Sequence, residues 1–399
     1  MTRGQPWRAA VAITVAALAR LSAADICSVI KQQGIEIQKP LSPHYYKDLA
    51  NYWSAACGDL KPTCIATPTS ALEMSAIVKQ LHNFDDLFAV KSGGHMPNNG
   101  FASIQDGLLI STENLDQVIY NPEDQTAIIG PGLTWEDAQK GLDGGLSFLS
   151  SQYGWAANNV VNFEVVLANG TVVNANAKEN TDLFAALKGG GNNFGIVTAY
   201  TLQTHPQDHK VWGGNYIFTA DKTPQVLSAL RDFTEHYPDD KAAIIVTCEH
   251  GLLIHTWIMF LFYDGPEPPE GVFTNFTAIG PTDTTKTWDS YYDLDLLDFP
   301  TDQDYIIIEL DFSYAFAADD GKIDAANQNL YRGFDNIISD NIDKGLLPDV
   351  YRPLFLNDAY FRQDYWGRIR TREQALQTRI KYDPDGFFQK RTSGGFRLH

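Results

Sequence analysis

The residues best suited to chemistry form a short run in the first quarter of the chain, Val90-Lys-Ser-Gly-Gly-His95. An apolar strand pattern leads into this run, so a strand would end at the glycine pair Gly93 and Gly94. Glycines at such a position let the backbone come close to a ligand because no Cβ intervenes. Successive backbone N–H groups in the turn form a concave anion site, which suits a pyrophosphate. His95 would then stand where the backbone meets the ligand.

A second glycine-rich run extends from Asp182 to Thr198. It begins with a helical pattern, continues through three consecutive glycines, and ends with Gly195 in front of an apolar strand. A Rossmann site needs the order strand, glycines, helix, so that phosphate meets a helix N-terminus. The order here is helix, glycines, strand, which argues against a nicotinamide-dependent dehydrogenase. The chain also lacks the Gly-x-Ser-x-Gly elbow that is typical of serine hydrolases.

Alternating short helices and strands must position both runs. Helices are predicted over residues 70–82, 135–142 and 182–188, and strands over residues 88–90, 107–110, 127–129, 160–167, 171–174 and 196–202. From about residue 210 the pattern changes to that of a second α+β domain. Its strands are predicted over residues 211–218, 243–248, 252–262 and 305–312, and its helices over residues 224–236 and 323–338. A tail helix is predicted over residues 370–381.

In combination, these segments resemble the FAD-binding domain of the p-cresol-methylhydroxylase type, which vanillyl-alcohol oxidase and berberine-bridge enzyme share. The resemblance spans residues 60–204 and returns in the tail; its motifs are residues 62–68, 91–95, 144–150, 164–170, 182–198, 355–358 and 381–388. It implies an α+β protein in which two small subdomains hold FAD and an antiparallel-sheet substrate domain with helices faces the flavin ring. Residues 25–205 would form the FAD-binding domain, residues 206–349 the substrate domain, and residues 350–399 a segment that returns to the FAD domain.

The resemblance also implies roles for single residues. The histidine of the family's Arg/Lys-Ser-Gly-Gly-His motif is typically bonded to the flavin 8α-methyl group, and His95 is the matching residue. Many relatives add a second bond from a cysteine in a downstream loop. No cysteine lies between Cys64 and Cys248 here, so a single covalent attachment through His95 is expected.

The remaining FAD contacts implied by the resemblance are mostly backbone contacts. The amides of Ser92 to Met96 would bind the pyrophosphate, and Ile196 and Val197 would line the adenine. Asn357 matches an asparagine near the flavin ring, in a motif whose tyrosine is Phe355 here, so a phenolic role at that position is lost. The full set of predicted FAD-binding residues is Lys91, Ser92, Gly93, Gly94, His95, Met96, Gly144, Gly145, Gly195, Ile196, Val197 and Asn357.

One stretch of the chain is shorter than the family pattern. Relatives place a glycine-rich loop after the position of Trp135, whereas this chain passes directly from Asp143 to Gly144 and Gly145. That loop normally wraps the pyrophosphate and part of the flavin, so its loss removes charge-assisted hydrogen bonds worth about 1.5–3 kcal/mol each. Three explanations stay open: a skipped exon or faulty gene model, which we favour; retention of FAD through His95 despite the loss; and a secreted relic that has lost the cofactor.

The ends and the cysteines of the chain indicate export. Residues 1–24 combine a basic start, an apolar run and small residues before Asp25, which is the pattern of a signal peptide. An exported protein pairs some of its cysteines, and Cys27 with Cys64 is the preferred bridge, with Cys57 and Cys64 as the alternative. Cys248 is expected to be free and buried. Two sequons begin at Asn169 and Asn275 and would carry glycans in a secreted protein.

Composition limits the partners. The formal net charge is −19 and no basic run occurs, which argues against nucleic acid and against an anionic membrane surface. The expected partners are a small-molecule substrate and O2, and the expected state is a monomer.

The expected activity is that of an oxidase. Hydride would pass from an alcohol, amine or sugar-like substrate to the flavin and then to O2, with a protein base near the substrate. Tyr263, Glu309 and Tyr314 of the second domain are candidates for this base, and the sequence assigns none of them. Cys248, His250 and His255 cross a predicted hairpin without a fourth ligand, so no metal site is predicted. The rival hypothesis is a flavin-free secreted scaffold.

Overall fold

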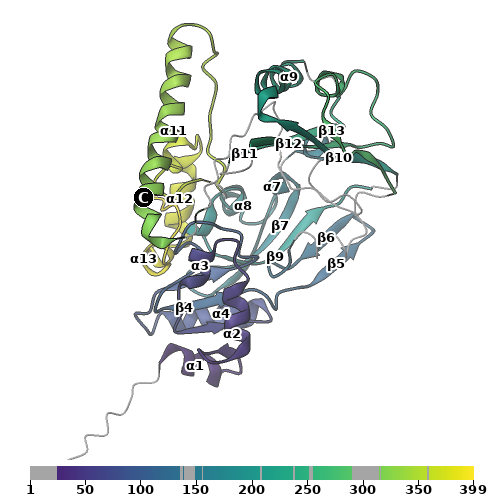
Figure 1. Ribbon diagram of the computed structural model, residues 1–399. Helices are drawn as coiled ribbons and strands as arrows, with labels where there is room; N and C mark the ends of the chain where they lie inside the picture. Colours follow the sequence, from purple (N-terminus) through teal and green to yellow (C-terminus); the bar gives the residue numbers. More distant parts are fainter. Residues whose placement is uncertain are drawn as a thin grey trace, which may run out of the picture.

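The computed structural model describes residues 25–134, 138, 149–154, 156–206, 209–236, 239–250, 255–289, 314, 316–356 and 359–399. Within these residues the strands form three sheets, which follow one another along the molecule in Figure 1. We call them the first, second and third sheet in chain order. The predicted signal peptide, residues 1–24, lies outside the described residues.

The first sheet is mainly parallel and is covered on both faces. Its order is β1-β2-β4-β3, with β1 (Ile37–Gln38), β2 (Cys64–Ala66), β3 (Phe88–Lys91) and β4 (Leu108–Ser111). The surrounding helices are α1 (Ile26–Gln32), α2 (Pro43–Ala50), α3 (Ala55–Asp59) and α4 (Ala71–Leu81). α1 and α4 pack on one face, and Tyr45 and Leu49 of α2 pack on the other. Burial on both faces explains why β2 and β4 are apolar almost without interruption.

The second sheet is antiparallel, with order β5-β6-β9-β7-β8. Its strands are β5 (Val118–Asn121), β6 (Thr126–Ile129), β7 (Val160–Val166), β8 (Val172–Asn176) and β9 (Ile196–Gln203). The short helices around it are α6 (Ser150–Tyr153), α7 (Ala156–Asn159), α8 (Thr181–Leu187) and the 3₁₀ turn η1 (Gly191–Asn193). β7 pairs with β9 from Ile196 to Leu202, whereas β6 pairs only from Tyr200 to Gln203. The first half of β9 therefore has one edge that no described strand occupies.

The third sheet is also antiparallel, with order β11-β12-β10-β13 and with β14 paired to β10. Its strands are β10 (Val211–Thr219), β11 (Ala242–His250), β12 (His255–Tyr263), β13 (Thr282–Asp283) and β14 (Lys286–Trp288). The 3₁₀ turn η2 (Ala220–Lys222), α9 (Thr223–Glu235) and α10 (Thr274–Thr277) follow or cover it. α9 and α10 share an apolar core with one face of the sheet. The opposite face, with Val211 and Phe262, packs on Leu149 and lies toward the second sheet (Figure 1).

The C-terminal segment returns to both of the first two sheets. It contains η5 (Trp366–Arg368), α12 (Arg372–Tyr382) and α13 (Phe387–Arg391). Asp383 accepts hydrogen bonds from the backbone N–H groups of Phe387 and Phe388, at 2.6 and 2.9 Å, and both rings enter the core of the first sheet. The side chain of Trp366 and that of Leu398 enter the core of the second sheet. The tail therefore fastens the two sheets to each other.

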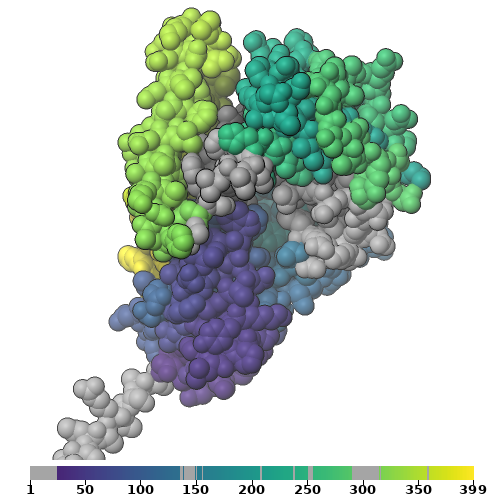
Figure 2. Space-filling model, viewed as in Figure 1, coloured from purple at the N-terminus to yellow at the C-terminus, as the bar shows by residue number. Residues whose placement is uncertain are grey.

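Helix α11 (Asp320–Asp343) forms a separate column at one side of the molecule, preceded by η4 (Ala317–Asp319) (Figures 1 and 2). None of its residues is buried. Two ion pairs hold it to the tail: Asp324 with Arg362 at 2.7 Å, and Asp335 with Arg368 at 2.9 Å.

The structure confirms the predicted fold class, a mixed α+β protein with antiparallel sheets, and most of the predicted elements. It also contains elements that were not predicted, among them α1 to α3, the strands β1, β5, β13 and β14, and the short helices α6, α7, α10 and α13. Helix α11 is longer than the predicted helix 323–338. The predicted helix 135–142 and the predicted strand 305–312 fall largely or wholly outside the described residues, and β12 begins at His255 because residues 251–254 are not described.

The cysteine predictions are confirmed in one respect and wrong in another. Cys27 and Cys64 form the preferred disulfide, with a Cα–Cα distance of 6.3 Å, which rules out the alternative pair with Cys57. Cys57 is free and buried. Cys248 is free as predicted, but it is exposed, because it lies near the end of β11, which is an edge strand of the third sheet.

Removing the disulfide tests how much this bridge contributes to stability. Replacing both Cys27 and Cys64 by Ser should lower the free energy of unfolding by about 2–4 kcal/mol, because the bridge restricts a long loop of the unfolded chain. Urea denaturation followed by circular dichroism would measure the loss. The exposed Cys248→Ser variant is the control and should unfold like the wild type. An unchanged midpoint in the double variant would contradict the prediction.

Candidate functional site

The predicted glycine turn lies at the end of β3, where the first and second sheets meet. Ser92, Gly93 and His95 are exposed, whereas Gly94 is buried. Gly94 has φ +77°, and a Cβ at this position would lie 2.3 Å from the carbonyl oxygen of Asn51. A Cβ on Gly93 would meet nothing within 4 Å. Gly94 must therefore be a glycine, because of its positive φ and its close neighbour. Gly93 has open space beside it.

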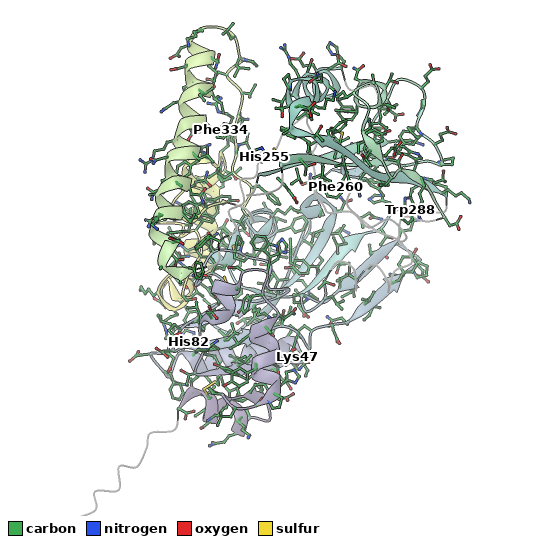
Figure 3. All side chains as sticks on the ribbon, viewed as in Figure 1. Lys47, His82, His255, Phe260, Trp288 and Phe334 are labelled. Atoms are coloured by element: carbon green, nitrogen blue, oxygen red, sulfur yellow. A yellow bond between two sulfur atoms is a disulfide. The ribbon has the colours of Figure 1, made fainter. Side chains whose placement is uncertain are left out.

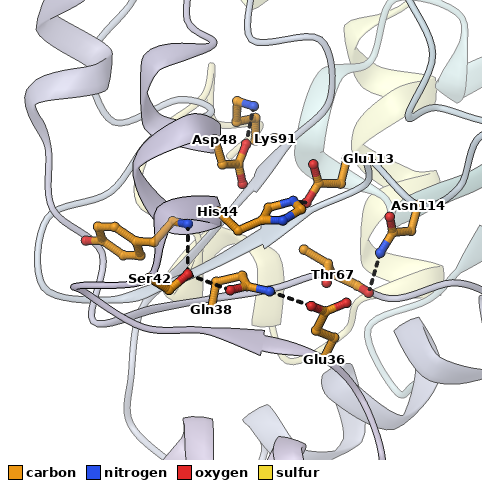
Figure 4. Close-up of polar contacts among 10 residues, drawn as sticks. Glu36, Gln38, Ser42, His44, Asp48, Thr67, Lys91, Glu113 and Asn114 are labelled. Carbon is orange, nitrogen blue, oxygen red and sulfur yellow. Dashed lines mark hydrogen bonds and ion pairs between the residues drawn. The ribbon is translucent and has the colours of Figure 1, made fainter.

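Lys91 is buried beneath this turn. Its Nζ lies 2.5 Å from Oδ1 of Asp48, and both side chains are 2% exposed (Figure 4). A buried ammonium requires a nearby anion because burial otherwise disfavours its charge. The charge of Lys91 is thus neutralised inside the protein, and within the site Lys91 supports the turn from below.

A second loop forms the facing wall of the turn. Ser92 donates its hydroxyl proton to the carbonyl oxygen of Pro131, and Thr112 donates to the same oxygen at 3.0 Å. A Cβ on Gly130 would lie 1.9 Å from the carbonyl oxygen of Leu115, and one on Gly132 would lie 2.2 Å from that of Thr112. Sequence analysis missed this wall, although two glycines flanking a proline directly after a strand were a readable signal of a tight turn.

The unoccupied edge of β9 lies next to that wall. β6 ends at Ile129, and the chain continues into the Gly130–Gly132 turn that Ser92 binds. The side chain of Ile196 packs into the core of the first sheet and that of Val197 against the core of the second. A Cβ on Gly195 would lie 2.4 Å from a methyl carbon of Val165, which explains the glycine. At Ile196 and Val197 the backbone edge, and not the side chains, is what a ligand can reach.

A cavity of about 320 Å³ lies where α4 meets the second sheet. It is lined by Thr69, Ser70, Ala71, Leu72, Leu115, Gln117, Glu164 and Thr198. Thr198 donates its hydroxyl proton to Glu164 at 2.7 Å, so the lining is polar on the β7–β9 side. The cavity lies between the first and second sheets, and none of the predicted FAD-binding residues is among its lining residues.

The tail closes the site from a third side. The buried amide of Asn98 donates to the carbonyl oxygen of Ala359 at 3.0 Å and accepts from the N–H of Phe361 at 3.3 Å. These bonds hold the tail against the loop that follows His95. The predicted residues Gly144, Gly145 and Asn357 lie outside the described residues.

The run of three glycines, residues 189–191, leads into a turn that contacts the C-terminal tail. Gly189 and Gly191 have positive φ, and the amide of Asn193 donates to the carbonyl oxygens of Gly190 and Phe396 at 2.8 and 2.9 Å. Oδ1 of Asn193 accepts the N–H of Leu398 at 3.2 Å. This part of the second motif therefore anchors the C-terminal residues.

His95 has an aromatic neighbour that sequence analysis missed. The Trp53 ring lies 5.7 Å from the His95 ring, centroid to centroid. The backbone N–H of Trp53 donates to the carbonyl oxygen of Gly94 at 3.0 Å. Below them, the thiol of Cys57 lies 3.2 Å from Oδ1 of Asn99, and burial raises the pKa of that thiol. Met96 is half-buried in this loop.

The candidate bases are not equivalent. Tyr263 donates to Asp239 at 3.0 Å, and burial together with that carboxylate raises its pKa to about 12. It also lies in the core shared with α9, on the sheet face away from the glycine turn. Burial and Asp320 raise the pKa of the exposed Tyr314, and Glu309 is not among the described residues. Tyr263 is thus a poor base, and the described residues assign no other.

Comparison with known proteins places this site in a family. Residues 62–149 match the model of an FAD binding domain. The chain is 40% identical to an uncharacterised FAD-linked oxidoreductase of Arthroderma benhamiae, over 94% of each chain. This chain belongs to the FAD-linked oxidoreductases. FAD is the cofactor that this family binds, and the resemblance found in the sequence is confirmed.

Solved structures show the same fold. BBE-like 1 of Physcomitrella patens superposes with a TM-score of 0.72 at 16% identity, over 94% of this chain and 100% of that one. A carbohydrate oxidase from Microdochium nivale superposes with a TM-score of 0.58 at 24% identity, over 68% of this chain and 63% of that one. Within the described residues, no helix is both long and apolar enough to cross a membrane.

The Arthroderma alignment also shows that this FAD-linked oxidoreductase is shortened internally. The alignment extends over 473 positions, whereas 94% of the 399 residues is about 375. The difference between 473 and 375 means that about 98 aligned positions of the relative have no counterpart in this chain. The shortening is larger than the single glycine-rich loop expected from the sequence.

Thiol labelling tests the environment of Cys57. At pH 8 the folded protein should expose one reactive thiol, Cys248, because burial raises the Cys57 pKa and lowers its thiolate fraction. Unfolding without reductant should release a second thiol. The Cys248→Ser variant should show no fast-reacting thiol until it unfolds. Rapid labelling of Cys57 in the folded protein would contradict the packing described beneath the His95 loop.

Proposed function

We propose that this chain is a secreted oxidase that holds FAD through a covalent bond to His95 and oxidises a small alcohol, amine or sugar-like substrate, with O2 as the final acceptor. The observation that carries the proposal is the exposed Ser92–His95 turn, with its open space at Gly93 and its buried support at Lys91. When bound, FAD supplies the two-electron acceptor that no side chain of the protein provides.

The described residues fit this cofactor. Ser92, Gly93 and His95 are exposed in a turn after β3, and successive backbone N–H groups in such a turn can bind a pyrophosphate. No described strand pairs with the β6-side edge of β9 at Ile196 and Val197, and backbone groups at this edge could pair with the hydrogen-bonding edge of an adenine. His95 is exposed, so its imidazole can reach a ligand without a rearrangement of the core.

The third sheet supports a substrate with an apolar body and one hydrogen-bond donor. Its face toward the second sheet is apolar, and Asn215, Phe260 and Ile245 lie opposite one another across three strands of that face (Phe260 is labelled in Figure 3). The Oδ1 atom of Asn215 is buried and has no hydrogen-bond partner. A buried acceptor without a partner is costly, and a hydroxyl or amine of a substrate would satisfy it. A carbohydrate, the substrate class named for the Microdochium oxidase, carries such donors.

Two features support export. The N-terminal residues have the pattern of a signal peptide, and the Cys27–Cys64 disulfide is typical of an oxidising compartment. Glycans on Asn169 and Asn275, and a monomeric state, remain part of this proposal.

A second candidate function is that of a flavin-free or impaired secreted scaffold. The internal shortening relative to the Arthroderma oxidoreductase favours it, since lost segments remove backbone contacts to a charged cofactor. The two candidates differ in whether the purified chain carries flavin.

An absorbance spectrum of the secreted protein, taken before and after acid denaturation, decides between them. We expect oxidised-flavin bands that stay with the precipitated chain and disappear from it in His95→Ala. His236→Ala, which removes an exposed histidine of α9, is the control and should keep the bands. A colourless protein that takes up no added FAD would reject the oxidase and leave the scaffold.

A further inference from the structure

The segment Asp48–Trp53 lies outside the residues matched by the FAD-binding model, yet it contacts the glycine turn at several points. We propose that Asp48–Trp53 is the positioning segment of the cofactor turn: it fixes the backbone of Ser92–His95 and orients the His95 ring for attachment. The inference rests on the proposed binding of FAD and extends the site to residues that no glycine motif contains.

The first contact is the buried ion pair. Oδ1 of Asp48 lies 2.5 Å from Nζ of Lys91, while Oδ2 is buried without a hydrogen-bond partner. Lys91 is thus the group that balances the Asp48 charge. The Tyr52 ring lies 5.1 Å from the same ammonium, and its hydroxyl donates to the carbonyl oxygen of Ala102 at 2.7 Å, which fixes the ring. The end of α2 therefore holds the last residue of β3, from which the turn departs.

The second contact is through the backbone. The carbonyl oxygen of Asn51 lies so close to Gly94 that no side chain fits there. The backbone N–H of Trp53 donates to the carbonyl oxygen of Gly94 at 3.0 Å. Gly94 is thereby held in its left-handed conformation. The carbonyl oxygen of Gly94 is thus directed toward Trp53, so that it does not repel an anion bound at the turn.

The third contact is between two exposed rings. Trp53 is 55% exposed, and its ring is tilted by 46° against the His95 imidazole. This large apolar ring therefore lies beside the imidazole and is accessible to a ligand. It limits the rotation of the imidazole and offers an apolar surface to a flat ligand. Both effects favour attachment of a flavin at His95, whereas a purely structural tryptophan would be covered.

Three variants of the full-length protein test the ion pair, and a fourth serves as the control. Asp48→Asn and Lys91→Met should lower the covalent flavin per chain about tenfold, because the turn loses its support, and Lys91→Arg should largely restore it. Flavin is measured as absorbance retained on acid-precipitated protein, and folding by circular dichroism. Asp289→Asn removes an exposed ion pair of 2.6 Å in the third sheet and should keep wild-type flavin.

Trp53 provides a test that does not disturb the core. Trp53→Ala should slow flavin attachment about tenfold, with Trp53→Phe in between. Tyr46→Ala removes an aromatic ring that is 50% exposed on α2 and should behave like the wild type. In a His95→Ala background, where binding is reversible, Trp53→Ala should weaken FAD and leave ADP unchanged, and Asp48→Asn should weaken both.

The outcomes separate this inference from the proposed function. A flavin-bearing wild type whose Asp48 and Trp53 variants attach flavin at the wild-type rate would overturn the inference alone. Variants that lose thermal stability while their affinity for ADP and FAD is unchanged would reduce the segment to a structural role and overturn it as well. A wild type that takes up no FAD would reject the proposed function and, with it, the inference.

Discussion

A buried positive charge at the end of β3 constrains the whole first subdomain. Lys91 closes the strand from which the glycine turn departs, and it is stable there only because Asp48 lies beside it. Asp48 is on α2, so that helix must lie across the face of the sheet opposite α1 and α4. The disulfide between α1 and β2 closes the other face. The exposed turn, where we propose that FAD binds, thus follows one of the most fully buried parts of the subdomain.

The glycines of the site are of two kinds: at some a side chain would clash with a neighbouring backbone, and at Gly93 it would not. Gly94, Gly130 and Gly132 allow backbones to touch, and a side chain at any of them would push two loops apart. A Cβ on Gly93 would meet no atom within 4 Å, so the packing of the fold does not require a glycine there. In the protein sequence all four look alike. The distinction depends on which carbonyl lies across the turn.

Local patterns predicted most of the fold because they reflect periodicity and turn chemistry. The helix at residues 71–81 and the strands β6, β7 and β9 were visible in this way. The partners of the turn were not visible, since Asp48 and Trp53 are distant in sequence and carry no motif. Helix α2 begins with Ser42 as N-cap and Pro43 in the first turn, a local signal that the sequence analysis did not use. The exposure of Cys248 depended on strand order, which no local pattern contains.

The tail makes the contacts of the site long-range in sequence. The side chain of Asn98 donates to the carbonyl oxygen of Ala359, 261 positions away. Asn193 binds Phe396 and Leu398, at separations of 203 and 205 positions. The tail also completes both cores, through Phe387 and Phe388 in the first and Trp366 and Leu398 in the second. Contacts between distant segments form slowly, because the entropy of closing a long loop is lost before the contacts are gained. The first two sheets therefore depend, for their complete cores, on the pairings that are slowest to form.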